Sequence, residues 1–282
     1  MKKILDVFIP TRNNSRTIIE TLESISSQTI NTQFNCFLLD NMSSDNTIEI
    51  VSNLFPEIQI IGSEKYLDVS QNFSRAFNLA QSEFFTICHA DDIYLPKHFE
   101  NLISVLKNQT ECLLCYSTSI AFSDLDNRVL DFISPTGGKI NETLDGIKYQ
   151  IFNRKELIEQ VLINGNSFPC PSIIYRKNIV SKLNFKYGQE NKKLIDTDDL
   201  YNLLEISKSS DICVSINPSL FYRRGNESMS FRKSLKFSFS KSHLLILKDI
   251  KKYPVSLKIK ISYFKRLIIE YLKSIFKYLF YW

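Results

Sequence analysis

The sequence predicts an α/β fold: a mostly parallel, Rossmann-like sheet with helices on both faces. Two observations carry this prediction. Through the first half of the chain, apolar runs of strand length alternate with segments of helical periodicity. Such repeats require helical crossovers between parallel strands. Polar and acidic residues also follow several of the apolar runs, at the positions where parallel strands would end and where ligands of open sheets bind.

The first half divides into alternating elements. Each expected strand is a short apolar run, and each expected helix spaces its apolar residues three or four positions apart, as Ile18, Leu22 and Ile25 do. We expect strands over 4–9, 34–39, 58–61 and 83–88, and helices over 15–28, 44–55, 69–81 and from Pro96 onward.

The second half is less regular. We expect strands over 113–122 and 212–216, and helices over 155–163 and 197–207. The segment 124–148 contains Asp126-Asn127, Pro135 and Gly137-Gly138, which are typical of turns, and this predicts a mobile loop.

Charge is distributed unevenly along the chain. Residues 231–282 hold 13 Lys and Arg but only Asp249 and Glu270, a net charge of +11, whereas the first 230 residues carry −6. Apolar residues recur at helical spacing among the lysines of this tail, at Leu257, Ile261, Phe264, Ile268, Tyr271, Ile275 and Leu279. Basic amphipathic helices of this kind suit an anionic membrane surface, and they suit packing against the preceding domain almost as well.

Composition disfavours several classes of protein. The single C-x-x-C pair, Cys112 and Cys115, has no second pair or nearby histidine, so a zinc site is not expected. No uncharged apolar stretch approaches the roughly 18 residues of a membrane span. Met1-Lys2-Lys3 leads directly into the first strand, so we expect no secretory signal. The chain lacks G-x-G-x-x-G and P-loop patterns, which removes the main support for dinucleotide and P-loop sites.

Four polar segments follow or begin the expected elements. They are 10–13, 40–47, 89–92 and 196–199. In a parallel sheet the first three converge on one edge. Asp91 and Asp92 are adjacent carboxylates at the end of a buried strand, which is costly unless a metal, a basic partner or solvent compensates the charge. Taken alone, such a pair is more often a solvated turn, and acids at 196–199 more often favour a helix N-terminus.

In their order, these segments resemble the motifs of a family 2 glycosyltransferase with the GT-A fold. The family's P-T-x-N resembles 10–13, its V-D-[DN]-x-S-x-D-x-T resembles 39–47, its N-x-x-R-A-x-N helix resembles 72–78, and its DXD-type motif resembles 89–92. Later motifs resemble 169–176, 198–199 and 222–230. The resemblance covers about residues 4–230 and rests on seven motifs in the right order.

The resemblance implies a metal-dependent, inverting transferase that takes a sugar from a UDP- or dTDP-linked donor. Asp92 would bind Mn²⁺ or Mg²⁺ directly, because a hard cation held by carboxylates stabilises a departing diphosphate. Asp91 would bind the donor's ribose or a metal-bound water and is the second candidate ligand. Asp199 would be the general base that deprotonates the acceptor hydroxyl, with Asp198 as the alternative.

Donor binding is assigned by the same resemblance. Asp40 or Asn41 would accept a hydrogen bond from the imide N–H of the base; where the family has a second Asp, this chain has Asn41. The base and ribose pocket would be lined by Pro10, Thr11, Arg12 and Asn13.

Two basic segments are assigned to the donor's diphosphate. Arg75 would bind the diphosphate or hold the acidic loop, beside Asn72, which is equally a simple polar helix residue. The family often has a histidine after Tyr-Arg; it is absent from Tyr222-Arg223-Arg224-Gly225, and Arg223 or Arg224 would contact the diphosphate instead. His89 is interpreted as a structural or substrate-facing residue rather than a ligand.

The implied organisation is a catalytic domain over 1–230, with a nucleotide-binding half at 1–110 and an acceptor-binding half at 111–230, followed by the 231–282 tail. The acceptor would be a glycan or lipid-linked molecule of bacterial surface polysaccharide synthesis. Because such acceptors are often lipid-linked, we favour a cytoplasmic protein held peripherally on the inner face of the membrane through the tail. No nucleic-acid partner is expected, since the first 230 residues are acidic.

Three other functions remain open at this point. The chain could be a catalytically impaired sugar-nucleotide-binding protein. A sugar nucleotidyltransferase is less favoured, because its Gly-rich, Arg-containing first loop is missing at 10–13. A nucleic-acid-binding protein would have to use the tail, whose lysines alternate with apolar residues.

Overall fold

The structure is a computed structural model of the 282-residue chain. It describes residues 3–30, 34–135, 137, 139–143, 145–165, 167–182, 198–225, 246 and 250–280, with the side chains at 198–201, 270, 271 and 273–280 excepted.

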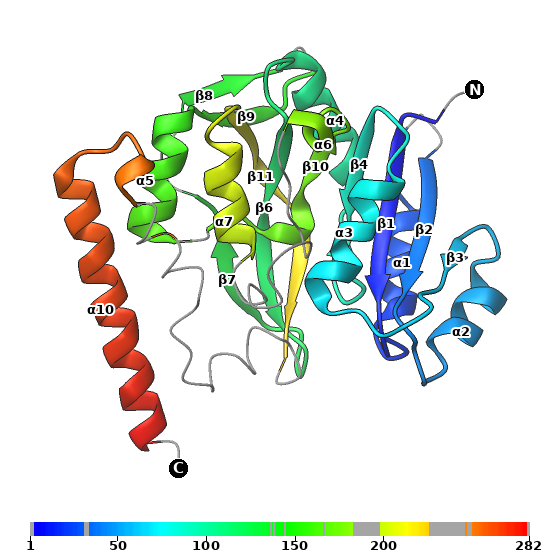
Figure 1. The fold of residues 1–282 in the computed structure, drawn as a ribbon. Helices are drawn as coiled ribbons and strands as arrows, with labels where there is room; N and C mark the ends of the chain where they lie inside the picture. Colours follow the sequence, from blue (N-terminus) through cyan, green and yellow to red (C-terminus); the bar gives the residue numbers. More distant parts are fainter. Residues whose placement is uncertain are drawn as a thin grey trace.

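A single mixed sheet forms the centre of the molecule (Figure 1). The strand order is β3-β2-β1-β4-β10-β6-β11-β9-β8, and the β1–β4 part is parallel throughout. The short strand β10 runs antiparallel to both of its neighbours, while β6 and β11 are again parallel to each other. The α/β fold with a mostly parallel core sheet is therefore confirmed.

The elements predicted in the first half are present with small shifts of their ends. They are β1 (Leu5–Thr11), α1 (Ile18–Ser26), β2 (Phe34–Asp40), α2 (Thr47–Leu54), β3 (Gln59–Ile61), α3 (Val69–Leu79), β4 (Phe84–Ile87) and α4 (His98–Asn108). Those predicted in the second half are also present, as β6 (Leu114–Ser123), α5 (Arg154–Asn164), α7 (Asp198–Ile206) and β11 (Ile212–Arg224).

The prediction of a loop over 124–148 is wrong. This segment contains β7 (Val129–Ile133) and β8 (Lys139–Glu142) and leads into β9 (Lys148–Phe152). Strand β7 pairs with β6 alone, and β8 with β9 alone, among the described residues. Both are edge strands with mostly exposed side chains, so they lack the buried apolar face that marks a strand in a sequence. Two further strands, β5 (Ile93–Tyr94) and β10 (Ile174–Arg176), were too short to predict.

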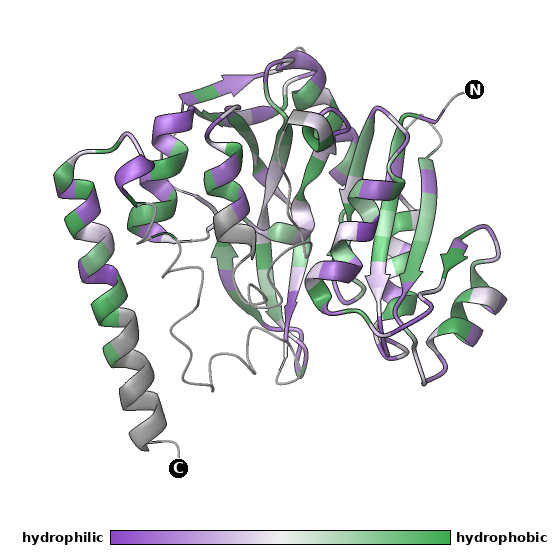
Figure 2. Cartoon of the chain, viewed as in Figure 1, coloured by the Kyte–Doolittle hydropathy of each residue, from purple (hydrophilic) through white to green (hydrophobic). Residues whose placement is uncertain are grey.

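Helices cover both faces of the sheet because the strands alternate their side chains. In β1, Leu5, Val7 and Ile9 face a core shared with α1, α2 and α4, whereas Phe8 faces a core shared with α3, α5 and α7. Figure 2 shows the strands of this sheet largely in green, between helices whose outer faces are purple. Both cores draw residues from each side of residue 110.

Strand β11 pairs with different strands along its length. Its first part pairs with β6 and β9, and after an irregularity between Ser215 and Leu220 its second part pairs with β6 and β5. This bend carries Arg223 to the loop that follows β4. The tail contributes a 3₁₀ turn (Ile250–Lys252) and the long helix α10 (Leu257–Phe280), which packs on α5. Among the described residues, no helix has the length and apolar character needed to span a bilayer.

Candidate active site

The ends of β1, β2 and β4 meet at one edge of the sheet, as the sequence predicts, and enclose a cavity of about 250 Å³. Seven of the predicted site residues line it: Pro10, Thr11, Arg12, Asn41, Asn72, Asp91 and Arg223. The remaining wall includes Tyr66, Phe73, His89 and Tyr222. Asn13, Asp40, Arg75, Asp92 and Arg224 do not line this cavity.

The loop after β1 is held by the loop after β2. Asn13 adopts the left-handed conformation (φ 54°), its N–H donates to Ser43 Oγ at 3.0 Å, and its Oδ1 accepts from the Ser44 N–H at 2.8 Å. Thr11 is buried, and its hydroxyl donates back to the Ile9 carbonyl at 3.0 Å. Arg12 is exposed and lies over the Tyr66 ring, 4.4 Å from its centre. This wall of the cavity therefore presents Arg12, from the loop after β1, and Tyr66, from the loop after β3, as its accessible groups.

Asp40 and Asn41 have different surroundings. The Asn41 amide donates to the Leu67 carbonyl at 2.8 Å, and its Oδ1 accepts from the Leu67 N–H at 2.9 Å and from Ser63 Oγ at 3.3 Å. Both acceptor positions of that oxygen are thus in use. The Asp40 carboxylate accepts from the Ser43 N–H alone among the described residues, at 3.2 and 3.3 Å. Asp40 therefore keeps acceptor capacity that Asn41 lacks.

Arg75 and Asn72 stabilise the base of the same loops. The Arg75 guanidinium donates to the carbonyls of Asp40, Ile61 and Gly62 at 3.1, 2.7 and 2.9 Å, and to Asn72 Oδ1 at 3.0 Å. Burial lowers the pKa of Arg75, and the Asp40 charge opposes this shift. Asn72 in turn donates to the Leu39 carbonyl at 3.2 Å. Four acceptors, three of them backbone carbonyls, thus surround the Arg75 guanidinium, and its assignment to the diphosphate or to the acidic loop stays a prediction.

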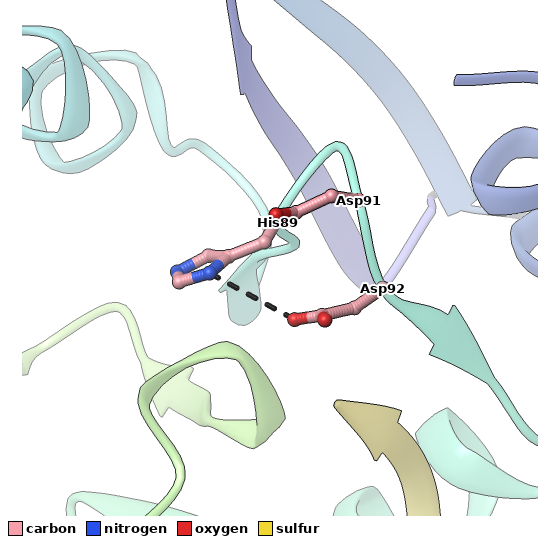
Figure 3. Close-up of side chains that lie close together, drawn as sticks. All are labelled: His89, Asp91 and Asp92. Carbon is pink, nitrogen blue, oxygen red and sulfur yellow. Dashed lines mark ion pairs between the residues drawn. The ribbon is translucent and has the colours of Figure 1, made fainter. Parts of the chain in front are cut away.

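The loop after β4 brings His89, Asp91 and Asp92 together (Figure 3). Asp92 is completely buried, with Oδ1 accepting from the Arg223 N–H at 2.8 Å and Oδ2 lying 3.8 Å from His89 Nδ1. Within the described part of the chain Oδ2 accepts no hydrogen bond. Burial, followed by repulsion from Asp91, raises the pKa of the Asp92 carboxyl well above its usual value. A buried carboxylate oxygen without a donor is a group that binds a proton or a cation.

This cluster fits a divalent cation. One ligand atom from each of the three side chains lies within 4.8 Å of the other two. Two carboxylates and an imidazole suit Mn²⁺, and carboxylates suit Mg²⁺. The sequence assigned Asp91 and Asp92 to this role but gave His89 a structural or substrate-facing one. The available signal was its position three residues before Asp92, on the same turn.

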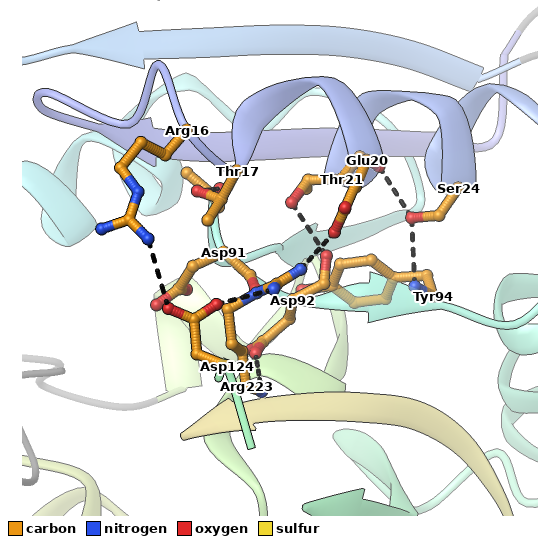
Figure 4. A network of polar contacts seen from close by, with 11 residues as sticks. Arg16, Thr17, Glu20, Thr21, Ser24, Asp91, Asp92, Tyr94, Asp124 and Arg223 are labelled. Carbon is orange, nitrogen blue, oxygen red and sulfur yellow. Dashed lines mark hydrogen bonds and ion pairs between the residues drawn. The ribbon is translucent and has the colours of Figure 1, made fainter. Parts of the chain in front are cut away.

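Helix α1 fixes the loop that carries His89, Asp91 and Asp92, which we call the carboxylate loop, through a row of polar side chains (Figure 4). Thr17 donates to the Ala90 carbonyl and Thr21 to the Asp92 carbonyl, both at 2.9 Å, and Ser24 accepts from the Tyr94 N–H at 3.0 Å. Spacings of four and three residues place these side chains on one helix face. The loop backbone is therefore held independently of the charges on Asp91 and Asp92.

Arg223 lies beside this loop, and its charge acts to lower the pKa of Asp92. Its Nε donates to the Asp91 carbonyl at 2.7 Å, and its two terminal nitrogens pair with Asp124, at 2.8 Å, and with Glu20 (Figure 4). The side chain is 11% exposed and lies over the Phe122 ring. Burial lowers the pKa of Arg223, but the hydrogen bonds that its guanidinium donates to Asp124 and Glu20 raise the pKa above its usual value overall. Arg223 thereby joins α1, the β6–β7 turn and the carboxylate loop.

Arg224, Glu20 and Asp124 complete the description of this region. Arg224 is more exposed and lies 4.0 Å from Asp131 and over the Tyr222 ring. Sequence reasoning missed Glu20 and Asp124. Asp124 directly follows a buried strand, as the other polar segments do, and this signal was available. Glu20 shows no signal beyond its place on the polar side of α1.

The predicted bases lie at the start of α7, which begins at Asp198. The side chains of Asp198 and Asp199 are outside the described residues, as are residues 196–197 and 228–230. The base assignment therefore stays a prediction.

Comparison with known proteins gives a family and a fold. The family model described as glycosyl transferase family 2 matches residues 6–183. An uncharacterized glycosyltransferase, MJ1057 of Methanocaldococcus jannaschii, is 26% identical over 202 residues, which cover 70% of this chain and 62% of that protein. The chain thus spans about three fifths of the length of this relative.

Solved structures agree with the family match. The crystal structure of S. aureus TarS 1–349 superposes with a TM-score of 0.63 at 16% identity, covering 98% of this chain and 72% of that one. The same protein in complex with UDP-GlcNAc gives a TM-score of 0.64 at 16% identity, with 98% and 73% covered. At this level of identity the likeness concerns the fold.

Proposed function

Because this chain belongs to glycosyl transferase family 2 and has the GT-A fold, we propose that it moves a sugar from a nucleoside-diphosphate donor to an acceptor hydroxyl, with inversion at the anomeric carbon. The observation that carries this proposal is the cavity at the ends of β1, β2 and β4, bounded by the His89, Asp91 and Asp92 cluster. The complex of TarS with UDP-GlcNAc supports a uridine donor over a thymidine one.

The base and ribose of the donor would lie against the cavity wall formed by Pro10, Thr11 and Arg12. Asp40 is the better acceptor for the imide N–H of the base, because the Asn41 oxygen is already engaged by Leu67 and Ser63. Asn41 and Asn13 then shape the pocket rather than read the base. Arg75 and Asn72 hold the same loops from below.

The acidic cluster would hold the divalent cation, Mn²⁺ or Mg²⁺. Asp92 would supply its Oδ2, which accepts no hydrogen bond within the described part of the chain, and Asp91 and His89 are the other candidate ligands. A cation bound there neutralises negative charge on the departing diphosphate. Arg223 keeps the loop in place through the Asp91 carbonyl. Arg223 or Arg224 would contact the diphosphate; Arg223 lines the cavity, and Arg224 is the more exposed of the two.

Asp199, or Asp198 in its place, would accept the proton of the acceptor hydroxyl. As the acceptor oxygen bonds to the anomeric carbon, the bond from that carbon to the diphosphate oxygen breaks, and the nucleoside diphosphate leaves. We place the acceptor among glycans or lipid-linked molecules of surface polysaccharide synthesis. The basic tail 231–282 would hold the protein on the inner face of the cytoplasmic membrane, where such acceptors are presented.

A donor screen tests this function. The purified chain is incubated with Mn²⁺ and a panel of UDP- and dTDP-sugars, and release of the nucleoside diphosphate is measured with and without candidate acceptors. We expect hydrolysis or transfer with a UDP-sugar. Binding without any turnover across the panel would instead identify a catalytically impaired donor-binding protein.

A matched pair of variants tests the base. Asp199→Asn should keep donor binding, measured by calorimetry, and lose transfer by roughly 10² to 10⁴. Asp198→Asn, its neighbour on the same helical turn, should keep most of the transfer. The reverse result would give the role of base to Asp198.

A further inference from the structure

The tail helix α10 has one face that is fixed to the rest of the protein. Tyr263 and Leu267, one turn apart, are buried in the core that includes α5. Between them in sequence, Arg266 donates to the Val161 carbonyl, in the last turn of α5, at 3.0 Å. Arg266 also lies close to Gly165, where an added Cβ would come within 3.0 Å of its guanidinium. These contacts fix the rotation of α10 about its own axis.

The opposite face of α10 is apolar and exposed. Leu257, Ile261, Phe264 and Ile268 are 72%, 47%, 54% and 45% exposed. Their spacings of four, three and four residues place them on one side of the helix. Ile269 and Leu272, about half exposed, extend this surface. We call these six residues the outer face. Figure 2 shows green and purple segments alternating along the coloured part of α10.

The charges around the outer face have one sign. Residues 250–269 contain six Lys and Arg and no acidic residue. Lys258 and Lys265 are exposed beside the apolar side chains. A second copy of the chain would bring the same positive charges into contact, and a nucleic acid would leave the apolar side chains in water. An anionic lipid surface satisfies both properties, because it accepts apolar groups at the acyl boundary and attracts the lysines.

We propose that the outer face of α10 docks in the plane of an anionic bilayer while the inner face stays on α5. The helix then lies on the membrane and the catalytic domain is held above it by Tyr263, Leu267 and Arg266. The proposal deepens the membrane placement given above and rests on it for its biological setting. The two alternatives for the tail, packing on the domain and binding of lipid, are both satisfied, because they use different faces.

Vesicle binding of the full chain tests the proposal. Sedimentation is compared with vesicles of phosphatidylcholine alone and of phosphatidylcholine with phosphatidylglycerol. We expect binding to the anionic vesicles that weakens with salt. The triple variant Ile261→Ser, Phe264→Ser and Ile268→Ser should lower partitioning roughly a hundredfold, at about fivefold for each side chain. Lys258→Gln with Lys265→Gln should lower it roughly twentyfold.

The matched control is a triple serine variant at Leu125, Val129 and Phe132, which are exposed on the β6–β7 hairpin (84%, 51% and 65%). It should bind vesicles as the unchanged protein does. Equal binding by the α10 variant, or equal binding to neutral vesicles, would overturn the proposal. So would a dimer in light scattering that the α10 variant converts to a monomer. None of these measurements depends on donor turnover, so a failure here is distinct from a failure of the proposed transferase activity.

Discussion

Replacement of Arg223 by methionine tests how the carboxylate loop is held. Methionine keeps apolar contact with Phe122 but removes every side-chain hydrogen bond. The lost bond to the Asp91 carbonyl is worth roughly 1.5 kcal/mol, because its donor is charged. The pair with Asp124, 24% exposed, adds about 1 kcal/mol, and the pair with Glu20, 57% exposed, adds no more than about 0.5 kcal/mol.

The expected loss in the free energy of unfolding is therefore about 3 kcal/mol, which at an unfolding entropy of about 2.1 cal/mol/K per residue lowers the melting temperature of this 282-residue chain by roughly 5 °C. Thermal denaturation followed by circular dichroism measures the change. Arg128→Met is the matched control, because Arg128 is 74% exposed and pairs only with Asp126 among the described residues. We expect a change below about 0.5 kcal/mol in that variant. Equal melting temperatures for the two variants would refute a stabilising role for Arg223.

The same variants separate stability from ion binding. The Arg223 N–H that donates to Asp92 belongs to the backbone and survives the substitution, so Asp92 itself keeps this contact. The Asp91 carbonyl loses its donor, so the carboxylate loop is held less tightly. Arg223→Met should therefore weaken Mn²⁺ binding, measured by calorimetry at a temperature where the variant is folded. Unchanged Mn²⁺ affinity would show that α1 alone suffices to order the loop.

Three further outcomes are expected. Asp92→Asn should raise the melting temperature of the metal-free protein, because it removes a buried, repelled charge, and should abolish the stabilisation by Mn²⁺; a persisting Mn²⁺ shift would exclude Asp92 as a ligand. Burial lowers the pKa of His98 to about 3, so the stability that the neutral imidazole contributes above its ordinary pKa near 6.5 is lost as the pH falls, by about 2 kcal/mol between pH 7 and 5. Denaturant melts of His98→Asn should lack this loss. Because Asp92 is present in both proteins, its opposite contribution cancels when the two are compared. Asp6→Ala should cost roughly 3 kcal/mol in the same assay, since it leaves the buried Ser82 and the N–H of Gln81 without their acceptor, whereas a cost below about 1 kcal/mol would show that water replaces it.

The order of elements from β1 to β4 could be predicted because each carries its own signal. The strands are apolar runs, the helices have a clear period, and parallel connections place every loop at a known edge. The site at that edge followed for the same reason: Pro10 and Asp40 lie at the ends of β1 and β2, Asp91 follows β4, and these three strands are neighbours in the parallel part of the sheet. Local pattern and topology were enough to bring these residues together.

Other parts of the site carry no local signal. Thr17, Thr21 and Ser24 look like a solvated helix face, and only the fold shows that the face is covered by the carboxylate loop. Glu20 and Arg223 are separated by 203 positions, and no spacing rule connects them. Strand β10 supplies three residues between β4 and β6, far from both in sequence. Contacts of this kind depend on the final packing and not on any single segment.

The charges around the carboxylate loop bear on the proposed cation. The labelled residues of Figure 4 include four carboxylates, at Glu20, Asp91, Asp92 and Asp124, and two guanidinium groups, at Arg16 and Arg223. With all of them ionised the group carries a net charge of −2. Asp92 Oδ1 accepts a hydrogen bond from the neutral Arg223 N–H and not from the Arg223 side chain, which stabilises the carboxylate but leaves the net charge unchanged. A guanidinium placed on Asp92 would have satisfied it within the fold. Its absence from that position among the described residues leaves Oδ2 for a proton or for the proposed divalent cation, which would balance the charge of the group.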